Sequence, residues 1–237
     1  IWIMSGRVGP PKPTFTNTYS LAFDGVDDEV NCGNNSSMQN PNFTISVWVY
    51  PTSISGIGNI AQNTTGTFSG ATYGFRVLRA SNHYVFYIGD GSGYNPVQIS
   101  SAVVLNTWQN LVMTYDGTNS KYYLDGLLKT TASVSNISYG VAPYNNFYIG
   151  TKGGSERFTG NIDEVCLLDR VAISSEIVTL STAPTVDLTS LSPISWWRMG
   201  DPNGQASYPT ITDDGSASND GTMTNMIAAD IETDVPT

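Results

Sequence analysis

The stretch Phe43-Thr-Ile-Ser-Val-Trp-Val-Tyr-Pro51 decides the fold class of this chain. Its apolar residues at 43, 45, 47 and 49 recur with a period of two, and Pro51 ends the run. That period is typical of a strand with one face in a core, and proline cannot donate to a sheet ladder. Further short runs with strand character lie at 73–79, 84–88, 108–115, 121–124, 146–150 and 162–168. Such a series, broken by turn residues, predicts an all-β sandwich of two antiparallel sheets.

Only one segment favours a helix, at residues 174–180. Glu176 would lie in its first turn, where the helix dipole favours a negative charge, and Ile177 and Leu180 repeat at helical spacing. The sequence therefore predicts a single short helix beside the sheets.

Composition excludes several classes of partner. Acidic residues outnumber basic ones 20 to 10 and give a net charge of −10. Nucleic-acid binding needs a basic face, so we expect no nucleic-acid partner. The chain has no apolar run long enough to span a bilayer, so we expect no membrane insertion. The many Thr, Ser, Asn, Gly and Tyr residues are typical of extracellular and virion-surface proteins, and we expect one of these locations.

Five motifs resemble the laminin-G-like branch of the concanavalin A-like lectin/glucanase superfamily. In chain order they are Tyr19–Val30, Phe43–Pro51, Trp108–Gly117, Tyr122–Gly126 and Gly160–Val165. The resemblance implies a jelly-roll sandwich that binds rather than catalyses. It also implies that such domains act in recognition, adhesion or assembly of a virion or extracellular filament. A second interpretation is a carbohydrate-binding lectin module of a secreted polysaccharide-degrading system, and a third is a glycoside hydrolase.

The two ends of the chain stand apart from this pattern. Residues 1–18 are rich in glycine and proline and predict an extended arm, while residues 19–237 form the sandwich. In the family that the chain resembles, a Trp-rich segment and an Asn-Asp-Gly-Thr segment open the domain. Here they lie within 194–237 and predict closing, permuted strands; the alternative is the start of a truncated second copy. We expect the arm to pack on a neighbouring copy and to give a homo-oligomer; the alternative is that it folds back on its own sandwich.

The residue inventory argues against an enzyme. His83 is the only histidine, and it lies in a predicted hairpin without a nearby nucleophile. Asp163 and Glu164 are the nearest candidates for a glycosidase pair, but adjacent strand residues point to opposite faces unless a bulge intervenes. We therefore expect no catalytic residues.

Acidic turns are the better candidates for a site. Asp24, Asp27 and Asp28 surround Gly25, and a second group holds Asp213, Asp214, Asn219 and Asp220. Calcium prefers six to eight oxygen ligands of these types. Either loop, with Asp163 as a further candidate ligand, predicts one calcium ion; the alternative is that these side chains hold their own turns.

Aromatic and sulfur-containing residues complete the candidates. Tyr94 and Tyr144 lie in Gly/Asn/Pro-rich segments and are predicted to bind a ligand such as a glycan, whereas Trp48, Trp108 and Trp196 are predicted core residues. Cys32 and Cys166 are either a disulfide, which the family's strand arrangement would permit, or two buried thiols.

Overall fold

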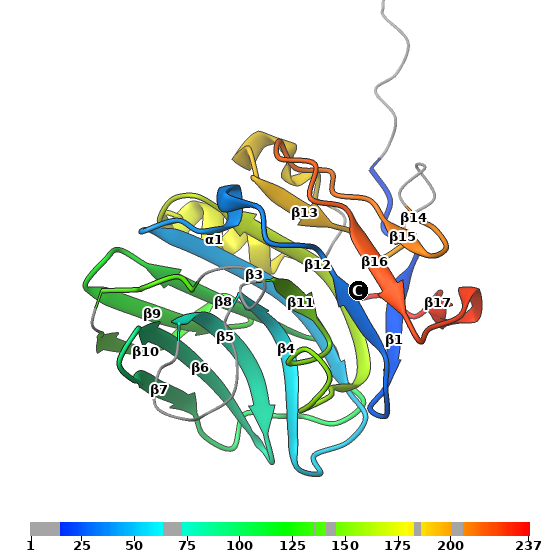
Figure 1. Cartoon of the computed structure of the whole chain (residues 1–237), viewed down its shortest axis with the longest axis horizontal. Helices are drawn as coiled ribbons and strands as arrows, with labels where there is room; N and C mark the ends of the chain where they lie inside the picture. Colours follow the sequence, from blue (N-terminus) through cyan, green and yellow to red (C-terminus); the bar gives the residue numbers. More distant parts are fainter. Residues whose placement is uncertain (1–14, 64–72, 135, 141–145, 183–185, 201–205) are drawn as a thin grey trace, which may run out of the picture.

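The computed structural model describes residues 15–63, 73–134, 136–140, 146–182, 186–200 and 206–237. These residues form two antiparallel sheets that pack face to face, with one α-helix, α1 (Ser174–Ser181), at the side (Figure 1). The prediction of an all-β sandwich with one short helix is confirmed. None of the described helices is long and apolar enough to cross a membrane.

One sheet has eight strands, and the segment Phe43–Pro51 forms one of its inner strands. Its order is β10 (Leu127–Ser133), β9 (Asn119–Leu124), β8 (Gln109–Tyr115), β3 (Phe43–Pro51), β12 (Thr159–Leu168), β1 (Ser20–Asp24) and β17 (Ile231–Glu232). A short strand, β13 (Ser195–Trp197), also pairs with β12. On β3 the residues Phe43, Ile45, Val47 and Val49 face the core, as their period of two predicts.

The other sheet has nine strands. Its order is β14 (Ala206–Ser207), β15 (Thr210–Ile211), β16 (Gly221–Thr224), β2 (Glu29–Asn31), β11 (Phe147–Ile149), β4 (Ile57–Asn63), β5 (Tyr73–Ala80), β6 (His83–Asp90) and β7 (Tyr94–Ile99). The order alternates between distant parts of the chain, because β2, β11 and β16 are neighbours although long stretches of sequence separate them.

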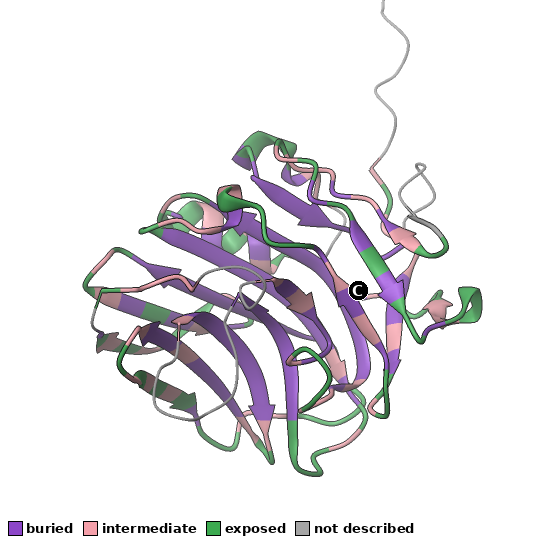
Figure 2. Ribbon diagram, in the orientation of Figure 1, coloured by how far each residue is buried: buried purple, intermediate pink, exposed green. Residues whose placement is uncertain are grey.

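Aromatic pairs join the two sheets across the core. Phe43 stacks on Phe75 with ring centroids 4.5 Å apart, and Phe147 stacks on Trp197 at 4.9 Å. Such pairs add to the stabilisation from burying large apolar surfaces. Figure 2 shows buried residues running along the strands and exposed residues gathering at the turns. One continuous core therefore fixes the separation of the sheets.

A smaller apolar cluster covers the outer face of the eight-stranded sheet. Ile177 and Leu180 of α1 and Leu188 and Leu191 of the 3-10 helix η2 (Leu188–Leu191) pack there with Trp196. Two further 3-10 turns, η1 (Ser36–Met38) and η3 (Ala228–Asp230), lie in connections. The helix α1 and the turn η2 therefore cover part of the outer face of the eight-stranded sheet.

Both ends of the described chain are fastened to this sandwich. The C-terminal residues supply β13, β16 and β17, which pair with β12, β2 and β1 of the same chain. At the other end, Phe15 stacks on Trp196 with centroids 5.6 Å apart, and the Arg198 guanidinium lies 4.0 Å from the Phe15 ring. Residues 1–14 of the predicted arm lie outside the described residues, so packing on a neighbouring copy stays a prediction.

The structure tests the predicted burial of three tryptophans and the two interpretations of the cysteines. Trp48 and Trp196 are buried, whereas Trp108 is only partly buried and packs against Tyr50 with centroids 5.5 Å apart. Cys32 and Cys166 are both buried and are not joined in a disulfide. Burial raises the pKa of each thiol. The thiol interpretation therefore holds.

Candidate functional site

A row of side chains crosses the outer face of the nine-stranded sheet. Its members are directly paired across neighbouring strands, from β16 to β7: Thr222, Asn31, Tyr148, Gln62, Arg76, Tyr87 and Pro96. Directly paired residues point to the same side of a sheet. At about 4.8 Å per strand, the row is about 29 Å long. Gln62 and Arg76, in the middle of the row, are buried, whereas the residues at its two ends are exposed or half-buried.

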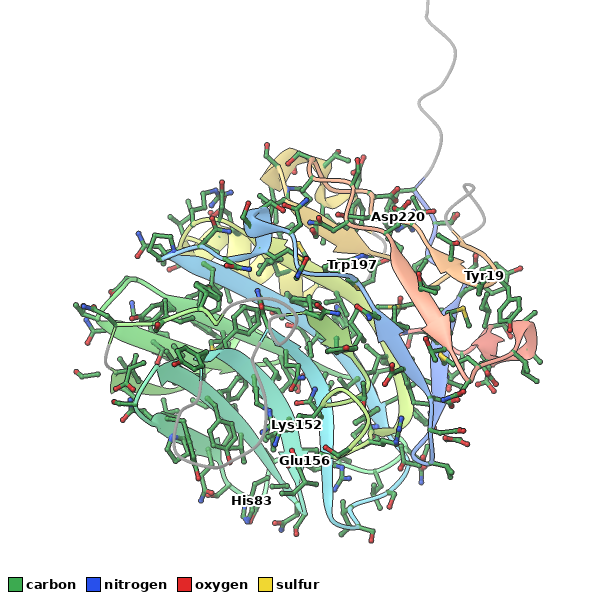
Figure 3. All side chains as sticks on the ribbon, in the orientation of Figure 1. Tyr19, His83, Lys152, Glu156, Trp197 and Asp220 are labelled. Carbon is green, nitrogen blue, oxygen red and sulfur yellow. The ribbon has the colours of Figure 1, made fainter. Side chains whose placement is uncertain are left out.

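An ion-paired cluster occupies the middle of this row. Arg76 is 2% exposed, its Nε donates to the Asn59 Oδ1 at 3.1 Å, and its guanidinium pairs with Glu156. Lys152 also pairs with Glu156, with 3.3 Å between Nζ and Oε1. Burial lowers the pKa of the Lys152 ammonium, and the charge of Glu156 opposes that shift. Figure 3 shows Lys152 and Glu156 next to each other over this sheet. Two cations therefore share the one carboxylate of Glu156, and the middle of the face is polar and charged.

Two tyrosines lie at the β7 end of the row. The Tyr87 and Tyr94 rings meet edge to face at 5.0 Å, and Arg76 lies over the Tyr87 ring at 5.6 Å. Burial raises the pKa of the Tyr87 phenol, whereas Tyr94 is 39% exposed. The structure thus places the predicted ligand residue Tyr94 beside Tyr87 at a sheet edge. The other predicted ligand residue, Tyr144, lies outside the described residues.

An open polar groove of about 510 Å³ lies at the β16 end of the same face. The residues that line it are Asn31, Cys32, Gly33, Asn34, Asn146, Asp220, Thr222 and Thr224. The Asn146 amide donates to Asn31 Oδ1 at 3.2 Å and contacts the Tyr148 hydroxyl at 3.4 Å. These contacts join the groove to Asn31 and Tyr148, the neighbouring members of the row.

The turn between β1 and β2 gathers the first predicted calcium ligands. One carboxylate oxygen from each of Asp24, Asp27 and Asp28 lies within 4.8 Å of the others. Asp24 Oδ1 accepts from the Val26 backbone N–H at 2.6 Å, and Asp28 Oδ2 accepts from the Asp24 N–H at 2.8 Å. Burial raises the pKa of Asp28 to about 6, a hydrogen bond from the Asp24 backbone lowers it, and the charges of Asp24 and Asp230 raise it further. Hard oxygen donors of this kind fit calcium, and the remaining carboxylate oxygens would be its ligands.

The second acidic loop is held by its own backbone. Asp213 Oδ1 accepts from the N–H groups of Trp196 at 2.6 Å and Gly215 at 2.8 Å, and Oδ2 accepts from that of Asn219 at 2.8 Å. Asp220 in turn accepts from the Asp213 N–H at 2.9 Å. The backbone N–H of Asp214 donates to the Trp196 carbonyl oxygen at 2.9 Å. This geometry fits the alternative interpretation, in which these residues hold their own turn.

Asp163 and Glu164 lie at a β-bulge in β12, the exception to regular alternation that the sequence argument allowed. The register with β3 shifts between Asp163 and Cys166, and Glu164 has φ of 48°. Asp163 is 0% exposed and accepts from Asn17 Nδ2 at 2.6 Å, while Glu164 binds the Trp196 indole N–H and pairs with Arg198 at 3.3 Å. Burial, followed by the charge of Glu164, raises the pKa of Asp163 well above its usual range.

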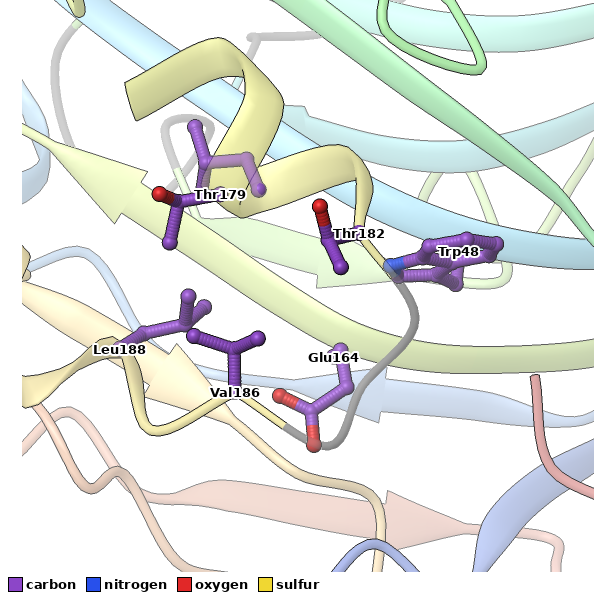
Figure 4. A pocket seen from close by; sticks show the side chains of 7 residues that line it. Trp48, Glu164, Thr179, Thr182, Val186 and Leu188 are labelled. Carbon is purple, nitrogen blue, oxygen red and sulfur yellow. The ribbon is translucent and has the colours of Figure 1, made fainter. Parts of the chain in front are cut away.

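The space beside these carboxylates is small. Glu164 lines a cavity of about 10 Å³ under α1, together with Trp48, Thr179, Leu180, Thr182, Val186 and Leu188 (Figure 4). That volume holds about one water molecule. Asp163 is also separate from the group formed by Asp24, Asp27 and Asp28. The pair therefore serves to join the bulge to the Trp-rich segment and to residues 15–17.

Sequence reasoning identified Tyr94 but missed the row of paired residues beside which it lies. Arg76 and Tyr87 lie in predicted strands, at positions that alternate with apolar core residues. This alternation in the sequence could have placed both side chains on the outer face of the sheet. His83, expected at a rim, lies at the start of β6 and accepts from the Ser101 N–H at 3.1 Å.

Comparison with known proteins gives a family and a set of similar structures. The family model described as concanavalin A-like lectin/glucanases superfamily matches residues 24–178. No curated protein sequence matches the chain.

The solved structures share the fold at low sequence identity. A candidate carbohydrate-binding protein from Bacteroides ovatus superposes with a TM-score of 0.69 and 16% identity over 92% of this chain; the chain spans 61% of that protein's length. The CBM40 domain of the Ruminococcus gnavus IT-sialidase, bound to α2,3-sialyllactose, has a TM-score of 0.53 and 16% identity, covering 68% of this chain and 98% of its own. A heptameric pentraxin from Limulus polyphemus has a TM-score of 0.52 and 13% identity, covering 70% and 82%.

Proposed function

The chain belongs to the concanavalin A-like lectin/glucanases superfamily, and from that premise we propose that it is a non-catalytic carbohydrate-binding module. Its binding surface is the outer face of the nine-stranded sheet. The observation that carries the proposal is the row from Thr222 to Pro96, which has a polar groove at one end and half-buried Tyr87 with exposed Tyr94 at the other. Ligand sites combine aromatic surface with a few placed polar groups, and sugars offer both apolar ring faces and hydroxyls.

The similar structures support this choice over the other interpretations. Two of those named above are a candidate carbohydrate-binding protein and a domain bound to a sialylated sugar. None of those named is a virion or filament protein, so recognition of a glycan replaces the expectation of a virion or filament component. A glycan ligand also accords with the expected extracellular location, and the expected homo-oligomer stays a prediction.

The geometry of the buried carboxylates supports a non-catalytic role. A retaining glycosidase needs two carboxyl groups about 5 to 5.5 Å apart on either side of a sugar bond. Asp163 and Glu164 are instead engaged by Asn17, Trp196 and Arg198, next to a cavity of about 10 Å³ that cannot admit a sugar.

Calcium at the β1–β2 turn is a separate part of the proposal. Asp24, Asp27 and Asp28 would be its protein ligands. When bound, the ion's two positive charges would offset most of the negative charge of the three carboxylates and so stabilise the turn between the two sheets.

Substitution of the tyrosine pair tests the proposed surface. We expect Tyr87→Ala and Tyr94→Ala each to weaken binding of the best ligand on a glycan array about tenfold or more, the usual cost of losing an aromatic anchor. Tyr50→Ala is the matched control, because Tyr50 belongs to a similar aromatic pair on the eight-stranded sheet, at 5.5 Å from Trp108. Equal losses in all three variants would contradict the proposed surface.

A further inference from the structure

The polar groove at the β16 end is made by two separate parts of the sequence. Asn31, Asn34 and Asn146 come from the region that the family model matches, residues 24–178. Asp220, Thr222 and Thr224 come from the C-terminal residues beyond it. The groove exists because β16 pairs with β2, where Thr222 lies opposite Asn31 and Thr224 opposite Glu29. It is therefore a feature that the C-terminal strands add to the sheet.

The chemistry of the groove suits an uncharged ligand rich in hydroxyls. Amide and hydroxyl side chains both donate and accept hydrogen bonds, as sugar hydroxyls do. Asn34, Thr222 and Thr224 are exposed, so their polar groups are accessible from solvent.

Charge in the groove disfavours an acidic sugar. Asp220 is exposed, and one of its oxygens accepts from the Asp213 N–H at 2.9 Å, so its carboxylate is a hydrogen-bond acceptor at the groove wall. Among the described residues that line the groove, none is lysine, arginine or histidine. A carboxylate or sulfate on a ligand would meet Asp220 without a compensating cation, and the chain as a whole carries a net charge of −10.

We propose that this groove is a sugar subsite that selects an uncharged unit of the glycan. Its Asn and Thr side chains bind the sugar hydroxyls, and the carboxylate of Asp220 repels anionic sugars. The inference rests on the proposed function, because the groove is the end of the row that carries it. It also assigns a role to the C-terminal strands, which supply half of the polar wall.

Calorimetric titration of the full chain tests the selection. The probes are neutral gluco-, manno- and galacto-oligosaccharides, with oligogalacturonate and sialyllactose as the acidic set. We expect at least one neutral probe to bind at least tenfold more tightly than either acidic probe. Thr222→Val and Asn34→Ala should each weaken that binding about 3- to 10-fold, the effect of losing one hydrogen bond. Thr131→Val is the matched control, since Thr131 is an exposed threonine on β10 of the other sheet, and it should leave affinity unchanged.

The outcomes separate this inference from the function on which it rests. Neutral preference with weakened binding in both groove variants supports the inference. Loss of binding in Tyr87→Ala and Tyr94→Ala with none in the groove variants overturns the subsite and leaves the carbohydrate-binding function standing. Preference for an acidic probe does the same. Binding of no probe to the folded wild-type chain overturns both. The melting temperature of each variant is measured first, and if Thr222→Val does not fold, Asn34→Ala decides.

Discussion

Asp28 is a residue whose burial decides its chemistry. It is 6% exposed, and burial raises its pKa to about 6 from an ordinary value near 3.8. Between these two values the folded state holds a proton that the unfolded state has released. The protonated Asp28 side chain therefore contributes to the free energy of unfolding in full below pH 3.8, and this contribution is lost as the pH rises through about 6. A cation that binds the ionised carboxylates would offset this loss.

We therefore predict that calcium stabilises the protein in a pH-dependent way. Millimolar calcium, compared with chelator, should raise the melting temperature more at pH 7 than at pH 5, because proton and ion compete for Asp28. In Asp28→Asn the difference between calcium and chelator should be much smaller at both pH values. Scanning calorimetry gives the result, and an equal melting temperature with calcium and chelator at pH 7 would contradict the calcium site.

The C-terminal strands β13, β15 and β16 are held together by the side chain of Asp213. Asp213 accepts three backbone N–H groups and so fixes the loop between β15 and β16 against β13. Hydrogen bonds to a charged group contribute about 1.5 to 3 kcal/mol each, and they are not additive. We predict that Asp213→Ala lowers the free energy of unfolding by about 3 kcal/mol in urea denaturation. The exposed Asp169→Ala should change it by less than about 0.5 kcal/mol, and an equally small change in Asp213→Ala would refute the assigned role.

Strand β3 could be predicted from the sequence, whereas the bulge in β12 could not. The period of two in 43–51 predicts both the strand β3 and its core face, because a local pattern fixes which side of a strand is apolar. The bulge at Asp163 and Glu164 has no such local signal. Glu164 is held at φ of 48° by Trp196 and Arg198, which lie more than thirty residues further along the chain. The pairing of β13 with β12 is what brings these two residues to Glu164.

At the scale of the whole molecule, the candidate surface is a product of strand order. Its row runs through residues 222, 31, 148, 62, 76 and 87, and no linear motif contains more than one of them. Sequence reasoning could name Tyr94 as an accessible aromatic residue, but the pairing of β16 with β2 and of β11 with β4 decides its polar neighbours. The two outer faces also differ, since an apolar cluster under α1 covers part of the eight-stranded sheet.

A map of the bound glycan on the protein tests the central claim most directly. The measurement is a titration of isotope-labelled protein with its best-binding oligosaccharide, followed by backbone amide chemical shifts in NMR spectra. We expect the largest shift changes on β16, β2, β11 and β4 to β7, around Asn31, Tyr148, Arg76 and Tyr87. Changes concentrated on β8 to β10 or on α1, with the nine-stranded sheet unaffected, would contradict this expectation.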